Sequence, residues 1–427
     1  MRTEKSGWTA ALLILQIAVG AMLAVVVLEL RALVRSRAVL FLLLAAVAWM
    51  AAFPSLVTGD GTAEGARELD IHFSLGGVFA LLVVALLASA TGTLARERAA
   101  KRLQLTLARP VGRASLILGK ITAHVVVGAG VLAVACGVLA ARADLATPCR
   151  HVLSPILPSV QEEAKQMYAA CMADTNTPAA VRHAPKSTIL RILANRAVDR
   201  YETVATNAVA HWRFAAPGDA VRLRFTNPFE MRQNVCGVLR SGAAERAVSN
   251  ITQTVVVFPF KGETADLYFE NRGMGTLMFR PRRDVNVLRT ADAFAWNLLR
   301  AYVALVSVLA LVVAFGTLLG ACLSRPVALF VAFVTLTVGE MGPSVIEQYP
   351  EDLATTFTDR IGLVISRFAA SVTRPISADS PLEALAKDEC VEPSRVAGLA
   401  LANLVVVPLA FSLLGAFLLP RKQDDLV

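Results

Sequence analysis

The strongest chemical feature of the sequence is a cluster of cations between residues 96 and 120. Seven cations accompany a single carboxylate, Glu97, in this stretch: Arg96, Arg98, Lys101, Arg102, Arg109, Arg113 and Lys120. Each Arg or Lys at the centre of a bilayer costs about 2.5 to 3.5 kcal/mol, so seven would cost on the order of 20 kcal/mol. We therefore expect a loop outside the hydrocarbon, and cationic loops of membrane proteins face the cytoplasm.

Apolar residues in the same loop indicate a binding surface. Leu103, Leu105 and Leu107 are closely spaced, and Arg109-Pro110 follows them. A short helix of this kind can lie in a groove of a partner protein while the flanking cations meet lipid headgroups. The alternative is a generic basic loop whose Arg and Lys side chains simply reach the headgroups.

Other chemistries find little support. A Gly-Lys pair occurs at Gly119, but six residues separate Gly112 from Gly119 where a phosphate-binding loop has four. Soft candidate ligands occur at Cys149 with His151, and at Met167, Cys171 and Met172 on one helix. Met and Cys at such spacing are more often packing residues, so we predict no metal site. The sequence also has no hydrolase elbow, HExxH motif or paired catalytic carboxylates, and we predict no enzyme active site and no cofactor in this chain.

The elements that carry this loop are membrane helices. Of the 427 residues, 56% are hydrophobic. This fraction is too high for a soluble protein with one or two hydrophobic cores of ordinary size. Six stretches have the length of about 20 apolar residues that a spanning helix needs: 38–57, 73–94, 121–141, 293–320, 326–342 and 395–419. The net charge of +9 is not gathered on one soluble domain, so we predict no nucleic-acid partner.

The loops between these stretches predict their orientation. The loop after the first is acidic, and so is the segment from Glu347 to Glu392, whereas Arg325 and Arg421 mark cytoplasmic connections. His124, one turn into the third stretch, either faces a transport path or hydrogen-bonds to a neighbouring helix. The N-terminal run 8–30 has two readings: it crosses the membrane, or it lies as an elbow helix on the cytoplasmic surface.

Residues 142–292 contain no run of spanning length and are expected to form an extracytoplasmic domain. Helical spacing predicts helices at 161–172 and 187–204, and alternation predicts strands at 221–226, 251–258, 265–270 and 275–279. A small β-sandwich with a helical preface fits this order. Cys149, Cys171, Cys236 and Cys390 all fall outside in this orientation, where one or two disulfides can form. A further amphipathic helix is predicted near residues 360–374.

The cationic loop resembles the loop between the second and third spans of type-2 ABC transporter permeases. The residues that match are Leu103, Leu105, Leu107, Arg109, Pro110, Val111, Arg113, Gly119 and Lys120. Lys101-Arg102 stand where that family usually has Gly-Thr, and Thr106 replaces a leucine. Residues 30–37 and the turn Ser324-Arg325-Pro326 also resemble that family. The resemblance covers residues 27–141 and 293–420. Within the family, the chain is most similar to the branch associated with multi-copper enzyme maturation.

The apolar runs, the loop charges and the pattern of residues 142–292 predict a fold and a domain organisation, with which the resemblance agrees. The fold is an α-helical integral membrane protein with six core transmembrane helices plus an N-terminal hydrophobic or elbow helix, and an inserted α+β, β-sandwich-like extracytoplasmic domain. Residues 1–141 would hold the first three spans and the coupling loop 95–120, residues 142–292 the outer domain, and residues 293–427 the last three spans with an outer loop at 343–394.

The resemblance also implies a function, that of a permease subunit of an ABC exporter in the bacterial inner membrane. Its partners would be an ATP-binding subunit that holds ATP and Mg, a second identical or related permease subunit, and membrane lipid. The implied coupling residues are Arg96, Glu97, Arg98, Lys101, Leu103, Leu105, Leu107, Arg109, Pro110, Arg113, Gly119 and Lys120, with elbow contacts at Glu29, Arg31, Arg35 and Arg37. The alternative is a membrane-anchored assembly or sensor protein whose outer domain binds a partner without transport.

Overall fold

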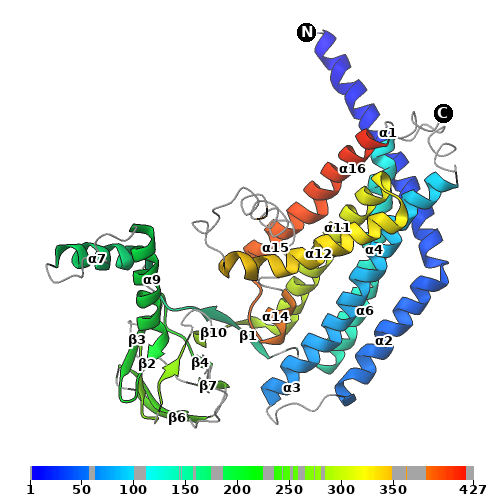
Figure 1. The fold of residues 1–427 in the computed structure, drawn as a ribbon. Helices are drawn as coiled ribbons and strands as arrows, with labels where there is room; N and C mark the ends of the chain where they lie inside the picture. Colours follow the sequence, from blue (N-terminus) through cyan, green and yellow to red (C-terminus); the bar gives the residue numbers. More distant parts are fainter. Residues whose placement is uncertain are drawn as a thin grey trace. The chain divides into compact units, whose positions relative to one another are not determined.

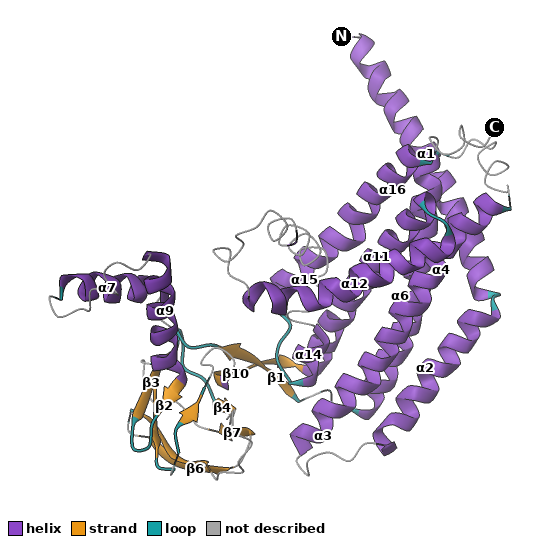
Figure 2. Cartoon of the chain, viewed as in Figure 1, coloured by secondary structure: helices purple, strands orange, loops and turns teal. Residues whose placement is uncertain are grey.

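The computed structural model describes residues 2–56, 63–100, 112–143, 145, 147–156, 160–174, 186–224, 235–242, 244–250, 253–257, 265–273, 275–279, 284–348, 362 and 381–419. The chain divides into two compact units, Met1–Thr147 with Ala293–Val427, and Pro148–Asp292. Each unit has a hydrophobic core of its own. The described part of the first unit is helical, whereas the second combines helices with strands (Figure 2).

The first unit is a bundle of long apolar helices (Figure 1). Its described elements are α1 (Arg2–Val34), α2 (Arg37–Leu56), α3 (Ala63–Asp70), the π-helical turn η1 (Ile71–Leu75), α4 (Gly76–Ala99), α6 (Arg113–Arg142), α11 (Phe294–Cys322), α12 (Arg325–Gln348), α14 (Pro381–Ala386), α15 (Pro393–Ala400), the π-helical turn η3 (Leu401–Val406) and α16 (Val407–Leu418).

Five helical stretches among the described residues are long and apolar enough to cross a membrane. They are Arg37–Leu56, Gly65–Ala99, Arg113–Arg142, Phe294–Cys322 and Pro393–Leu418. Each contains most of one predicted span, so the apolar runs at 38–57, 73–94, 121–141, 293–320 and 395–419 are confirmed as helices of spanning length. The predicted run 326–342 lies in α12, which contributes a shorter apolar helix, Arg325–Thr337.

Helix α11 is the centre of the bundle. It contacts α4, α6, α12 and α16, and every residue from 304 to 314 is buried. Its contact with α4 depends on glycine: a Cβ at Gly320 would lie 2.5 Å from the backbone oxygen of Thr91. Because that neighbour is backbone, a side chain at residue 320 would push the two helices apart.

Helix α1 packs along α6, and this contact also depends on a glycine. A Cβ at Gly119 would lie 2.8 Å from Val25 Cγ1 and 3.1 Å from the backbone oxygen of Met22. The predicted run 8–30 is thus part of one continuous helix that reaches α6 at its C-terminal half.

The second unit is a β-sandwich. Its strands are β1 (Pro148–Leu153), β2 (Thr203–Val204), β3 (Val209–Arg213), β4 (Ala220–Arg224), β5 (Val235–Ser241), β6 (Ala244–Asn250), β7 (Gln253–Val257), β8 (Asp266–Asn271), β9 (Leu277–Met278) and β10 (Val285–Ala293). One sheet has the order β1-β10-β4-β7, a second β3-β8-β5-β6, and β2 pairs with β9. Leu223 and Val287 from the first sheet share one core with Trp212 and Phe269 from the second, as in a sandwich.

The helices of this unit are close to their predicted positions. The predicted helix 161–172 is α7 (Val160–Ala173), and the predicted helix 187–204 is α9 (Lys186–Glu202). The end of the second prediction is wrong, because Thr203 and Val204 leave the helix and pair with β9. The two helices pack on each other through a small core of Ala164, Ile189 and Leu193.

The strand predictions were incomplete. Strands β4, β7, β8 and β9 overlap the four predicted runs, but β1, β3, β10 and the β5–β6 hairpin had no prediction. Gly242, with a φ of 55°, turns the chain between β5 and β6. Arg222, which the alternation of β4 assigns to the side away from the sandwich core, is also buried. The predicted amphipathic helix near 360–374 lies outside the described residues except for Gly362.

Candidate functional site

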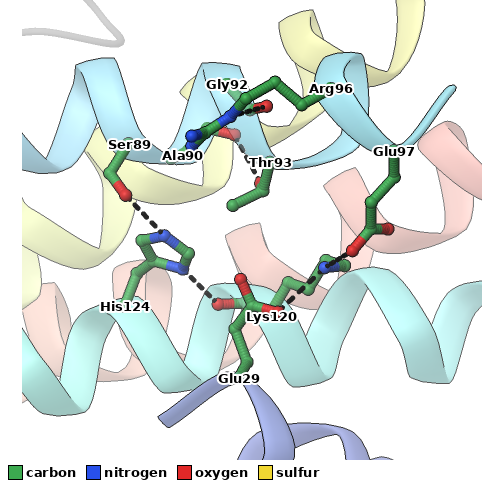
Figure 3. Close-up of polar contacts among 9 residues, drawn as sticks. All are labelled: Glu29, Ser89, Ala90, Gly92, Thr93, Arg96, Glu97, Lys120 and His124. Atoms are coloured by element: carbon green, nitrogen blue, oxygen red, sulfur yellow. Dashed lines mark hydrogen bonds and ion pairs between the residues drawn. The ribbon is translucent and has the colours of Figure 1, made fainter. Parts of the chain in front are cut away.

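Three charged side chains from three helices meet inside the bundle. The ammonium Nζ of Lys120 on α6 lies 3.0 Å from Oε2 of Glu29 on α1 and 2.7 Å from Oε1 of Glu97 on α4 (Figure 3). The Lys120 side chain is only 3% exposed, and the carboxylate side chains are 17% and 30% exposed. These three residues are called the Lys120 cluster below.

The local sequence explains why the cluster forms. Lys120 is two turns into α6 and directly follows Gly119, the residue that lets α1 approach closely enough for Glu29 to reach the ammonium. Glu97 stands in the last turn of α4, at the end from which residues 101–111 lead to α6. A buried charge is tolerated only when it is paired, so the three helices are held together at this end of the bundle.

The neighbouring arginines contact helices instead of joining the cluster. Arg98 donates from Nη1 to the backbone oxygen of Ala321 at 2.7 Å and from Nη2 to that of Leu323 at 2.6 Å. These are terminal carbonyls of α11, which a cation at a helix C-terminus satisfies. Arg96 donates from Nε to Gly92 of its own helix at 2.9 Å. Glu97 and Arg98, adjacent in sequence, therefore bind two different helices.

His124 lies one turn beyond Lys120 and bonds to both α6 and α4. Its Nδ1 is 2.8 Å from the backbone oxygen of Lys120, and its Nε2 is 3.1 Å from Oγ of Ser89 (Figure 3). A carbonyl can only accept, so Nδ1 carries a proton, and Nε2 accepts from the Ser89 hydroxyl in the neutral ring. This is the hydrogen bond to a neighbouring helix that the sequence left as one of two alternatives.

The predicted coupling residues are only partly described. Lys101, Leu103, Leu105, Leu107, Arg109 and Pro110 lie outside the described residues. Arg113 is exposed in the first turn of α6, and Arg31, Arg35 and Arg37 are exposed around the junction of α1 and α2. Of the predicted set, the structure brings Glu29, Glu97, Gly119 and Lys120 together. Ser89 was not predicted, because one serine in an apolar run carries no sequence signal of its partner.

Two of the six cysteines are disulfide-bonded. Cys149 and Cys390 are disulfide-bonded, whereas Cys136, Cys171, Cys236 and Cys322 are not in disulfides. Within the described part of the chain, no three His, Cys, Asp or Glu side chains are gathered as a metal ion would need.

Searches for related proteins found no counterpart. No protein-family model, curated protein or solved structure matches this chain. Its function therefore has to follow from its own residues and their geometry.

Proposed function

We propose that this chain is the membrane-spanning permease subunit of an ABC exporter, driven by a separate ATPase subunit. The observation that carries the proposal is the Lys120 cluster. Glu97 and Lys120 come from the two ends of the stretch that resembles the coupling loop of type-2 ABC permeases, and both meet Glu29 of the predicted elbow segment. In this proposal α12 is the fifth of six core spans, and α1 is an elbow or an additional span.

The cluster suggests how one loop could move several helices. Residues 101–111 connect α4 directly to α6. Glu97 and Lys120 link both helices to α1, and Arg98 links α4 to the C-terminal end of α11. A displacement of the loop by a partner ATPase would therefore be transmitted to four helices: α1, α4, α6 and the central helix α11.

Charge and disulfide positions support one orientation. The cationic loop 96–120 would face the cytoplasm and the β-sandwich unit the extracytoplasmic side. Cys149 and Cys390 both fall in segments that the charge pattern assigns outside, and both are disulfide-bonded. Disulfides persist in oxidising compartments, which agrees with an outer location and with a bacterial inner membrane.

The remaining partners follow from the proposal. ATP and Mg would bind to the ATPase subunit, and a second permease subunit, identical or related, would face this one around the path. An alternative, a membrane-anchored assembly or sensor protein, is favoured by the separately folded sandwich, on whose outer surface Val209 and Tyr268 are 57% and 39% exposed.

Copurification tests the proposal. The full chain is extracted from its native membrane in mild detergent, and the eluate is examined for a stoichiometric P-loop ATPase. The double substitution Arg109→Glu with Pro110→Gly should remove the ATPase, whereas Arg289→Glu, an equal change of charge on an exposed strand residue, should retain it. Absence of an ATPase from the unaltered chain, under conditions that preserve other complexes, would favour the assembly protein.

A further inference from the structure

The helix formed by α15, η3 and α16 contains a buried amide, that of Asn403. Asn403 is only 4% exposed. Its Nδ2 is buried and has no hydrogen-bond partner among the residues that the structure describes. Exposed apolar side chains surround it along the chain, with Leu401 at 63% and Val405 at 47% exposure. The amide is thus the group that this turn directs inward.

The position of Asn403 along the helix places it well inside the apolar stretch, ten residues from its start and fifteen from its end. The stretch Pro393–Leu418 is one of the five of spanning length. Asn403 is ten residues from its start, about 15 Å at the helical rise of 1.5 Å per residue. The hydrocarbon core is about 30 Å thick. At that depth lipid offers no hydrogen bond, and polar residues in such places mark paths or contacts between helices.

The helix is held against α11 on both sides of this turn. Asn297 on α11 donates from Nδ2 to the backbone oxygen of Glu389 at 2.8 Å and accepts from the backbone N–H of Val391 at 2.8 Å. Towards the other end, the rings of Phe315 and Phe411 lie 6.4 Å apart. Between these anchors the chain changes to the π-helical turn η3, which also contacts α11.

A π-helical turn has one residue more than the α-helix would hold, and such turns occur frequently at functional sites. Asn403 at this turn lies seven residues, or about two helical turns, after the buried Val396 and therefore on the same inward face. Asn297 shows that an amide in this bundle can be fully paired, with both its ends used. Asn403 differs from Asn297 because its Nδ2 has no hydrogen-bond partner among the described residues.

We infer that Asn403 faces the transport path and donates a hydrogen bond to an acceptor oxygen of the transported molecule. This inference rests on the proposed exporter function and adds to it a residue that contacts substrate. An uncharged amide suits a carbonyl, ester or similar oxygen. Between transport events a water molecule would accept the same hydrogen bond.

Thiol labelling tests the inference on the full chain in vesicles, with Cys136, Cys171, Cys236 and Cys322 replaced by alanine and with Cys149 and Cys390 retained. The probe is a small water-soluble methanethiosulfonate. The matched control is Ser412→Cys, since Ser412 lies in the same membrane helix, is 1% exposed and donates to Leu409 of its own helix at 2.8 Å. Asn403→Cys should react on the order of tenfold faster, because the transport path would bring water and reagent to residue 403, whereas the control must first open by a local fluctuation. Equal, slow labelling of both variants would overturn the inference.

The effect of nucleotide on the labelling rate distinguishes a transport path from a closed site that only holds water. In the complex with its ATPase, ATP with vanadate should change the labelling rate of Asn403→Cys severalfold, whereas an unchanged rate would overturn the inference.

Asn403→Leu should raise the unfolding temperature and Asn297→Leu should lower it, because only the second loses hydrogen bonds. A lowered temperature for Asn403→Leu would reveal a structural partner and also overturn it. If no ATPase copurifies yet Asn403→Cys labels rapidly, the exporter proposal fails while the water-accessible site stands.

Discussion

At the residue scale, the Lys120 cluster shows how a cation can be buried among long apolar helices. One ammonium is shared by two carboxylates at 3.0 and 2.7 Å. Neither carboxylate could be placed so close to the other without it, because like charges repel strongly where water is scarce. Lys120 is thus the residue on which both ion pairs depend, and Glu29 and Glu97 are not equivalent to it.

Replacing Lys120 by methionine should therefore cost more than replacing either acid. Removing one partner of a buried ion pair costs about 3 to 5 kcal/mol. We expect Lys120→Met to lower the unfolding temperature in detergent clearly, and Lys120→Met with Glu29→Gln and Glu97→Gln to recover much of that loss. If the triple variant is no more stable than the single one, the cluster does not account for the burial of Lys120.

A second residue-scale prediction concerns acid stability of the sandwich unit. The pKa of Asp266 is lowered, first by its hydrogen bond with His211 at 2.9 Å and then by Arg213 at 3.2 Å. A carboxyl whose pKa is lower in the folded state stabilises the fold above its unfolded pKa of about 3.9, and this contribution is lost as the pH falls through the folded pKa.

Asp266→Asn should therefore reduce stability at neutral pH and flatten its decline below about pH 4. The loss at neutral pH should be less than about 1 kcal/mol, as for other exposed ion pairs. Amide protection of β3 and β8 by hydrogen exchange, corrected for the intrinsic effect of pH, measures this. An unaltered decline below pH 4 would show that other carboxyls dominate acid unfolding.

Part of this site was predictable from sequence. Glu97, Gly119 and Lys120 belong to a recognisable stretch, and Glu29 stood at the end of an apolar run where a charge is unusual. Ser89 and the carbonyls bound by Arg98 were not predictable, because those contacts depend on how α4 is rotated against α6 and α11. The composition of an apolar helix does not determine that rotation.

At the element scale, helix contacts depend on where side chains are missing. Gly320 on α11 would place a Cβ 2.5 Å from the Thr91 oxygen, whereas Gly130 on α6 has no atom within 4 Å of such a Cβ. Gly320→Ala should therefore force α4 and α11 apart and cost about 1 to 3 kcal/mol, as overpacking does. Gly130→Ala should be neutral or slightly stabilising. Thermal unfolding of the two variants in one detergent compares them, and equal effects would contradict the close contact.

The predictability of elements followed the strength of the hydrophobic signal. Long apolar runs predicted five membrane-length helices, because no soluble element needs twenty consecutive apolar residues. The strands were harder to predict. Strand β6 contains Glu245, Arg246 and Ser249, and only Val248 is buried among its described side chains, so its alternation was too weak to recognise. It is a strand because β5 pairs with it along its whole length.

At the scale of the whole molecule, the native cysteines offer a test of sidedness that needs no new residue. Cys236 is an exposed thiol of the sandwich unit, and Cys322 is a thiol in the last turn of α11, next to the Arg98 contact; neither is in a disulfide. In the proposed orientation, the first faces the outside and the second lies near the cytoplasm.

A membrane-impermeant maleimide should therefore label Cys236 on spheroplasts whose inner membrane is intact. Cys322 should remain unlabelled until that membrane is opened, and Cys236→Ser together with Cys171→Ser should abolish the signal from the outside. Cys149 and Cys390 should stay unreactive on either side unless a reductant is added first, because both are disulfide-bonded. Labelling of Cys322 before Cys236 would invert the orientation. It would place loop 96–120 outside the cell, beyond the reach of any cytoplasmic ATPase, and the exporter proposal would then fail together with the orientation.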